Sequence, residues 1–169
     1  GTNEHPTQAL LHALTLQIRL GSIEGLKVAI CGDIRHSRVA RSNAKLLPRL
    51  GAEVRLAGPP SLLPEDVPAM SIDEAIDGAD VVMMLRVQRE RLEEELGDGP
   101  GEYLERYGLT AKRLSKAAPG AVVMHPGPMN RNVEIADDVA DDPERSLIRL
   151  QVEAGVATRM ACLELVTSD

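Results

Sequence analysis

Short apolar segments that recur along the chain, separated by helical patterns, constrain this fold more than any other feature of the sequence. Residues 27–31, 80–85 and 121–124 are mostly unbroken runs of Val, Ile, Ala, Met and Leu, the pattern of strands buried on both faces of a parallel sheet. Residues 53–57 form a fourth predicted strand. Because helical patterns separate the strands, we predict an α/β fold: a doubly wound, Rossmann-like parallel sheet of four or five strands flanked by helices.

Two predicted helices differ from the others because they are apolar on more than one side. The first begins at Pro6, which suits the first turn of a helix, and extends to Leu20. The last covers residues 144–166. We expect each to be buried on two sides, by the other helix, by the sheet, or by a partner outside this chain.

The composition is that of one globular domain. With 169 residues and 43% hydrophobic content, the chain can build a core, although it has no Phe and no Trp. Its net charge of −7 argues against a general nucleic-acid surface, which needs a basic footprint. No apolar run approaches the length of a membrane span and no signal peptide is recognisable, so we expect no membrane partner. The chain begins at Gly1 in a motif-like run, as a segment cut from a longer protein would.

The two cysteines, Cys31 and Cys162, lie far apart in the sequence, without the spacing of a disulfide framework or a metal site. We expect both to be buried apolar residues. The compartment that this cysteine usage favours is the reducing cytoplasm.

Polar side chains follow three of the predicted strands. Arg38 follows the first strand, Arg86 and Gln88 follow the third, and the HPGP run of residues 125–128 follows the fourth. Because the carboxyl ends of parallel strands meet at one edge of a sheet, we expect these side chains to converge. Arg grips a carboxylate bidentately, so two Arg suit a ligand with two carboxylates. The alternatives are a solvated basic helix start for Arg38 and a surface ion pair for Arg86.

Two further features could act on a carbonyl group. Residues 125–128 form a stiff loop whose carbonyl groups can accept from an amide or carbamoyl NH₂, although by itself such a loop is also just a turn. His5 precedes a helix, whose positive end lowers the pKa of a His and favours the neutral ring as a donor to a carbonyl oxygen. A lone His is more often structural, and this is how we interpret His12 and His36.

Four motifs stand out along the chain: HPTQALL (5–11), GDIRHSRVARS (32–42), MLRVQRERL (84–92) and MHPGPMNRNVEI (124–135). They resemble the catalytic chain of the aspartate transcarbamoylase family, in that family's order and approximate spacing. The resemblance implies that residues 1–169 are the C-terminal, aspartate-binding half of such a chain. It also implies transfer of a carbamoyl group from carbamoyl phosphate to the α-amine of L-aspartate, an early step of pyrimidine biosynthesis, without a metal or an organic cofactor.

The resemblance assigns a role to each matching residue. On the aspartate side, Arg38 and Arg86 would bind the two carboxylates, with Gln88 near the amine. His5 would be the catalytic residue that polarises the carbamoyl oxygen. The carbamoyl group itself would be held by Gln8 and by the backbone of Pro126, Gly127 and Pro128.

One large departure from the family is visible. Its members carry an N-terminal carbamoyl-phosphate domain with a Ser-Thr-Arg-Thr phosphate loop, and a neighbouring subunit lends a Ser/Lys loop to the site. This sequence contains no Ser-Thr-Arg-Thr run. We therefore expect the carbamoyl-phosphate domain to be an absent partner, and the chain alone to have weak or no transferase activity. The family resemblance further implies a homotrimer or a larger assembly.

Other functions stay open from the sequence. The resemblance to an ornithine transcarbamoylase would imply His-Cys-Leu-Pro at residues 125–128 and an acidic group for the ornithine side chain, whereas Arg86 beside Gln88 favours a dicarboxylate. A non-catalytic assembly or regulatory domain of the same fold is a second alternative. A Rossmann nucleotide binder is disfavoured, because the turn after the first strand lacks G-x-G-x-x-G.

Overall fold

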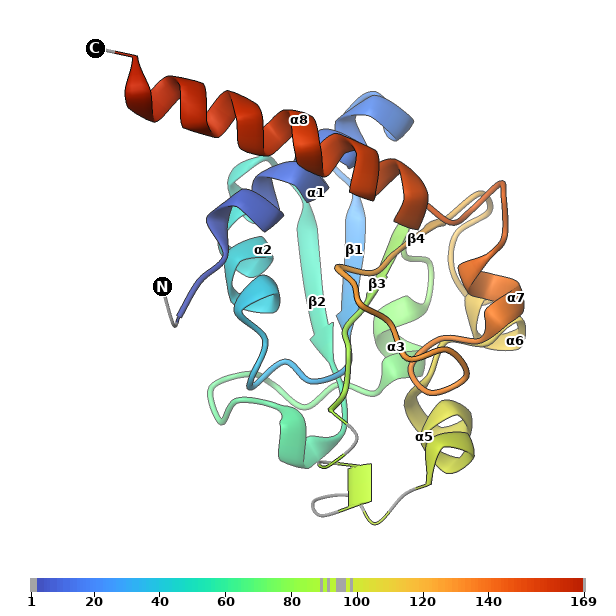
Figure 1. The fold of residues 1–169 in the computed structure, drawn as a ribbon. Helices are drawn as coiled ribbons and strands as arrows, with labels where there is room; N and C mark the ends of the chain where they lie inside the picture. Colours follow the sequence, from blue (N-terminus) through green and yellow to red (C-terminus); the bar gives the residue numbers. More distant parts are fainter. Residues whose placement is uncertain (1–2, 89, 91, 94–96, 98, 169) are drawn as a thin grey trace.

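The computed structural model describes residues 3–88, 90, 92–93, 97 and 99–168, and its centre is a four-stranded parallel sheet (Figure 1). The strands are β1 (Lys27–Cys31), β2 (Glu53–Ala57), β3 (Val81–Met84) and β4 (Val122–Met124), in the order β2-β1-β3-β4. Because β1 lies between β2 and β3, the connection that leaves the edge strand β2 passes β1 before it enters β3. The predicted α/β, doubly wound parallel sheet is confirmed.

Helices cover both faces of the sheet. Alternate residues of β1 show the division, since Val28 and Ile30 belong to one apolar cluster and Ala29 and Cys31 to the other. The first cluster packs beneath α1 (Pro6–Leu20) and α2 (Arg38–Arg49), and the second packs beneath α3 (Ile72–Ile76), α6 (Ala111–Leu114) and α7 (Asp137–Ala140). The chain is completed by η1 (Pro60–Leu62), α5 (Pro100–Tyr107) and α8 (Ile148–Thr167). The acidic and Gly-rich run of residues 93–101, whose composition predicts a loop, falls partly outside the described residues, and its last two residues begin α5.

The terminal helix begins later than predicted. Residues 145–147 run beside β4, where the N–H of Val123 donates to the carbonyl of Arg145 and the N–H of Leu147 donates to the carbonyl of Val123, both at 2.8 Å. These backbone groups complete the sheet edge and cannot also form helical hydrogen bonds, so α8 starts at Ile148 and not at residue 144. The segment occupies the place of a fifth strand but forms only a single bridge.

The helices α1 and α8 pack against each other, and the outer part of α8 projects beyond the rest of the domain (Figure 1). The predicted bounds of the first helix are confirmed. The outer face of α8 is not covered within this chain, where Val156 is 62% and Met160 is 65% exposed, so its burial by a partner outside the chain stays a prediction. The other large apolar side chains that these two helices leave exposed are Leu10, Leu14, Ile18, Leu20, Val152, Leu163, Leu165 and Val166.

The two thiols lie in different environments. Cys31 is fully buried in β1, and burial raises the pKa of its thiol to about 12. Cys162 is only half-buried in α8, so the expectation that both are buried is wrong for Cys162. Across the part of the chain that the structure describes, no helix is long and apolar enough to cross a bilayer.

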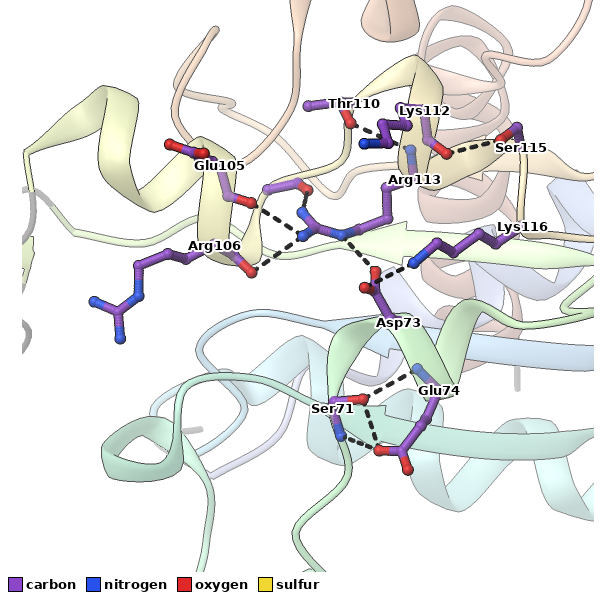
Figure 2. A network of polar contacts seen from close by, with 11 residues as sticks. Ser71, Asp73, Glu74, Glu105, Arg106, Thr110, Lys112, Arg113, Ser115 and Lys116 are labelled. Carbon is purple, nitrogen blue, oxygen red and sulfur yellow. Dashed lines mark hydrogen bonds and ion pairs between the residues drawn. The ribbon is translucent and has the colours of Figure 1, made fainter.

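Arg113, in α6, links the end of α5 to Asp73 in α3 (Figure 2). Its Nε lies 2.8 Å from Oδ1 of Asp73, and Lys116 binds the other oxygen of this carboxylate at 2.8 Å. The guanidinium also donates to the carbonyl groups of Glu105 at 3.0 Å and Arg106 at 3.2 Å, and to that of Gly108. These carbonyls end α5 and lack helical partners, so one cation satisfies the helix end and holds it against α3.

Candidate active site

A polar hollow of about 480 Å³ opens at the carboxyl ends of β1, β3 and β4. Seven of the eight residues that the sequence analysis selects line it, namely His5, Gln8, Arg38, Arg86, Gln88, Pro126 and Gly127. Pro128 does not line it. The lining also includes residues that the sequence analysis did not assign to the site, namely Asp33, His36, Ser37, Val39, Leu85 and Arg159.

The turn between β1 and α2 carries Arg38 to the rim of the hollow. Gly32 makes this turn possible, because its φ is +127° and a Cβ there would meet the carbonyl oxygen of Leu85 at 3.0 Å. Ser37 then caps α2, its Oγ accepting from the N–H of Ala40 at 3.0 Å. Arg38 follows as the first helical residue, at the helix end where an anion is favoured.

Asp33 and His36 stabilise the same turn. Asp33 is 3% exposed, and its Oδ1 accepts from the backbone N–H of His36 at 3.1 Å and lies 2.9 Å from Nδ1 of that ring. The sequence signal that could have found this pair is the Asp-x-x-His spacing directly after a predicted strand. The structural interpretation of His36 therefore holds for its contacts, although the residue also lines the hollow.

Arg86 and Gln88 extend from the end of β3. The chain stays extended beyond the strand, with Leu85 and Val87 buried and Arg86 and Gln88 exposed. Side chains two residues apart on an extended chain point to the same side, so both reach the hollow. The sequence favours surface ion pairs for Arg89 and Arg91, and both residues lie outside the described ones.

Gln8 joins three elements at the base of the hollow. It is 7% exposed in α1, and its Nε2 donates to the carbonyl of Pro126 at 3.4 Å. Its Oε1 accepts from Nη2 of Arg159 in α8 at 3.1 Å. On the inner side, Nε2 lies 3.2 Å from Nε2 of His12, whose Nδ1 lies 3.1 Å from Nδ2 of Asn43. His12 is thus structural, as expected, but its ring touches a residue of the hollow.

His5 lies at the mouth of the hollow, where it precedes α1. Its backbone N–H donates to Oγ of Ser42 at 2.8 Å, and its ring is half-buried. Burial lowers the pKa of His5 below its ordinary value, and the positive charges of Arg38 and Arg159 lower it further. The pKa shift has the direction that the sequence analysis predicts, and burial and the nearby cations favour the neutral ring.

Three guanidinium groups, those of Arg38, Arg86 and Arg159, face one hollow whose described lining contains a single carboxylate, that of Asp33. This excess of positive charge, inside an acidic chain, favours an anionic ligand. In the described part of the chain, the hollow included, no cluster of three or more His, Cys, Asp or Glu residues is arranged to hold a metal ion.

A doubly wound α/β domain with a polar hollow at the carboxyl edge of its sheet defines a class of proteins that bind a small ligand at that edge. The chain belongs to the aspartate/ornithine carbamoyltransferase family, whose Asp/Orn binding domain matches residues 24–166.

Its similar relatives include aspartate carbamoyltransferase catalytic subunits. That of Rhizorhabdus wittichii is 59% identical over 99% of this chain and 55% of its own length, and that of Granulibacter bethesdensis is 58% identical over 97% of this chain and 54% of its own length. This chain thus spans about half the length of the curated relatives that it matches.

Solved structures of the family resemble the fold as well. Aspartate transcarbamoylase from Trypanosoma cruzi, in complex with N-(phosphonacetyl)-L-aspartic acid, is 31% identical with a TM-score of 0.75 over 96% of this chain and 54% of its own. Ornithine carbamoyltransferase from Pyrococcus furiosus is 26% identical with a TM-score of 0.81 over 96% of this chain and 56% of its own. The backbone alone therefore does not separate the two substrates.

Proposed function

We propose that this chain is the aspartate-binding half of an aspartate carbamoyltransferase, which transfers a carbamoyl group from carbamoyl phosphate to the α-amine of L-aspartate. The single observation that carries the proposal is that Arg38 and Arg86, from two different strand ends, line one hollow together with Gln88. Two guanidinium forks suit the two carboxylates of aspartate, and the neutral amide of Gln88 suits the amine that must react.

The carbamoyl side of the reaction falls to the other wall. The neutral ring of His5 donates to the carbamoyl oxygen, where negative charge develops as the amine attacks the carbon. Gln8 and the carbonyl groups of Pro126 and Gly127 hold the carbamoyl NH₂. Pro128, which does not line the hollow, acts through the backbone of the loop. The new C–N bond forms as the bond from carbon to the phosphate oxygen breaks, and the phosphate leaves with the proton that the amine loses.

The rest of the enzyme supplies the phosphate site. We infer that a carbamoyl-phosphate domain, N-terminal in the whole enzyme, covers the apolar side chains that α1 and α8 leave exposed, such as Ile18, Val156 and Met160. The domain of residues 1–169 then contributes the linking helix α1 and the terminal helix α8 to that interface. The phosphate is not held by this half alone, so weak or no turnover is expected from the isolated chain. We further propose a cytoplasmic homotrimer or larger assembly.

The proposal favours aspartate over ornithine for two reasons. The relatives with 59% and 58% identity are named aspartate carbamoyltransferase catalytic subunits. In addition, the guanidinium groups that line the hollow would attract a second carboxylate, whereas the ornithine side chain carries a cation of its own and would be repelled.

Thermal denaturation of the isolated chain with two unreactive ligands tests this choice. Succinate, with two carboxylates, should raise the melting temperature in a concentration-dependent way, and norvaline should not. Arg38→Lys and Arg86→Lys should each weaken succinate binding roughly tenfold or more, because Lys cannot bind a carboxylate bidentately. Arg55→Lys is the matched control, since Arg55 is in β2 and outside the hollow. Stabilisation by norvaline alone would contradict the proposal.

A further inference from the structure

A buried network of hydrogen-bonded polar groups connects the two walls of the hollow. It consists of His125, Glu134, Asn130 and the carbonyl group of Val87. His125 begins the loop that carries Pro126 and Gly127, and Val87 lies between Arg86 and Gln88. Each link is a hydrogen bond of 2.6–3.0 Å. Buried hydrogen bonds thus join the segment that carries Arg86 and Gln88, on the aspartate side of the hollow, to the loop that carries Pro126 and Gly127, on the carbamoyl side.

The ring of His125 holds the loop in a defined orientation. Its Nδ1 accepts from the backbone N–H of Gly127 at 2.9 Å, so Nδ1 carries no proton. The proton is on Nε2, which donates to Oε1 of Glu134 at 3.0 Å. The residue is 1% exposed, and the backbone oxygen of His125 accepts from Nε2 of Gln151 at 2.5 Å. The loop therefore depends on one tautomer of a buried neutral imidazole.

Glu134 is the central residue of this network. Its side chain is fully buried, and its Oε1 accepts from the N–H of Asn130 at 2.6 Å as well as from His125. Its carbonyl accepts from the N–H of Leu109 at 2.9 Å, which anchors the residue to the body of the domain. From Asn130, the side-chain Nδ2 donates to the carbonyl of Val87 at 2.9 Å.

This carboxylate costs stability where it lies. Its Oε2 is buried and has no hydrogen-bond partner among the described residues, and burial of a carboxylate with one oxygen unsatisfied is unfavourable. An apolar side chain of similar size would fill the same space at less cost but could not bind His125 and Asn130 together. The arrangement is therefore better explained by the geometry that it imposes on the hollow than by the stability of the core.

We propose that Glu134 is a positioning residue, which acts through His125 on the carbamoyl-binding loop and through Asn130 on the segment that carries Arg86 and Gln88. The inference rests on the proposed function, because its purpose is to hold the two reactants at one fixed separation. Transfer between two bound molecules is sensitive to their relative placement, and displacements of about 1 Å lower rates roughly a hundredfold.

Substitution of Asn130 tests the link to the aspartate side. Turnover is measured in a fusion of this chain to the part of the Rhizorhabdus wittichii relative that it does not cover. Asn130→Ala removes the hydrogen bond to Val87 and leaves the buried pair intact, so the KM for aspartate should rise roughly three- to tenfold, with the KM for carbamoyl phosphate unchanged. Asn132→Gly is the matched control. Asn132 is in the same loop, its φ of 58° suits Gly, and its side chain forms hydrogen bonds with Asp137 and not with the residues of the network.

Substitution of Glu134 tests the central residue of the network. Glu134→Gln keeps an oxygen that can accept from both His125 and Asn130, so both KM values should stay close to those of the parent. Glu134→Met keeps the size and removes both hydrogen bonds, so kcat should fall and both KM values should rise. A structural role alone would lower the melting temperature of Glu134→Met without this difference between Met and Gln in kinetics.

Spectra of the isolated chain separate failure of this inference from failure of the proposed function. In proton–nitrogen correlation spectra, Asn130→Ala should move the amide signal of Gln88 but not that of Gly127, and Glu134→Met should move both. If these shifts occur but succinate does not bind, the proposed function is wrong, whereas the network still joins the two walls of the hollow. If Glu134→Met leaves the signals and both KM values as in the parent, or Asn130→Ala behaves like Asn132→Gly, the inference is wrong.

Discussion

Arg159 in α8 donates from Nη2 to the side-chain oxygen of Gln8 in α1 across 3.1 Å, although 151 residues separate them in the sequence. The bond orients the Gln8 amide so that its nitrogen faces the carbonyl of Pro126. Arg159 also donates to the carbonyl of Gly155 at 3.1 Å, which fixes the guanidinium against its own helix. The terminal helix thereby contributes a cation to the hollow.

The charge of Arg159 should be measurable at His5. Arg159→Met removes one of the cations that lower the pKa of His5, so this pKa should rise toward its ordinary value. The measurement is a titration of the His5 ring signals by nuclear magnetic resonance. Arg149→Met is the control, because Arg149 is on the same helix but does not line the hollow. An unchanged His5 pKa in Arg159→Met would show that the two charges do not interact.

His12 should make stability depend on pH in the acidic range. Burial lowers the pKa of His12 from 6.5 to about 4. The unfolded chain binds a proton at His12 more tightly than the folded chain does, so protonation favours unfolding. The stability that depends on neutral His12 is therefore complete above pH 6.5 and is lost as the pH falls to about 4. The loss should approach about 2–3 kcal/mol in the free energy of unfolding.

Urea denaturation at several pH values measures the effect of His12. The acidic residues also titrate in this range, so the parent must be compared with His12→Asn, which lacks the ionisable ring. The difference between the two chains should shrink as the pH falls from 6.5 to about 4. A constant difference across that range would contradict the assignment.

Arg113 should contribute to stability through the end of α5. Arg113→Met leaves the carbonyls of Glu105, Arg106 and Gly108 without their donor and removes the ion pair with Asp73 (Figure 2). The free energy of unfolding should fall by about 1–3 kcal/mol, because the side chain is only 14% exposed and its charged hydrogen bonds are shielded from water. Lys112→Met, an exposed neighbour in α6, should change it by less than about 0.5 kcal/mol.

The exposed apolar face of α8 should matter for assembly and not for the fold of this chain. Val156→Lys with Met160→Lys should leave the melting temperature of the isolated chain nearly unchanged, because both side chains already face solvent. The same pair should prevent stable association with the remaining half of a relative, measured by co-purification and analytical ultracentrifugation. Association at parental strength would place the interface elsewhere.

Much of the architecture follows from local patterns. The unbroken apolar runs predict the buried strands, because a parallel sheet covered on both faces has no solvated side that would require alternation. Pro6 and the capping box at Ser71 mark helix starts for reasons that lie within a few residues of chain. The start of α8 is different, since the backbone of residues 145–147 is claimed by β4, a segment far away in the sequence.

The same division holds for the hollow. Seven of its lining residues could be selected from the sequence, because they directly follow strands or match a motif in which neighbouring residues act together. Arg159 could not, because it lies within a long helix with no local sign that it points to a ligand. The hydrogen bond from Asn130 to Val87 was equally hidden, since 43 residues separate the two and they come together only after the sheet has formed.

The order of strands and helices along the chain, and with it the edge of the sheet at which the polar hollow opens, was determined by the sequence alone. These properties depend on local periodicity and on the handedness of crossover connections, which every L-amino-acid chain shares. Only the tertiary structure decided which distant polar groups meet. A hydrogen bond is made or lost over less than 1 Å, roughly, and no pattern along the chain specifies a separation so finely.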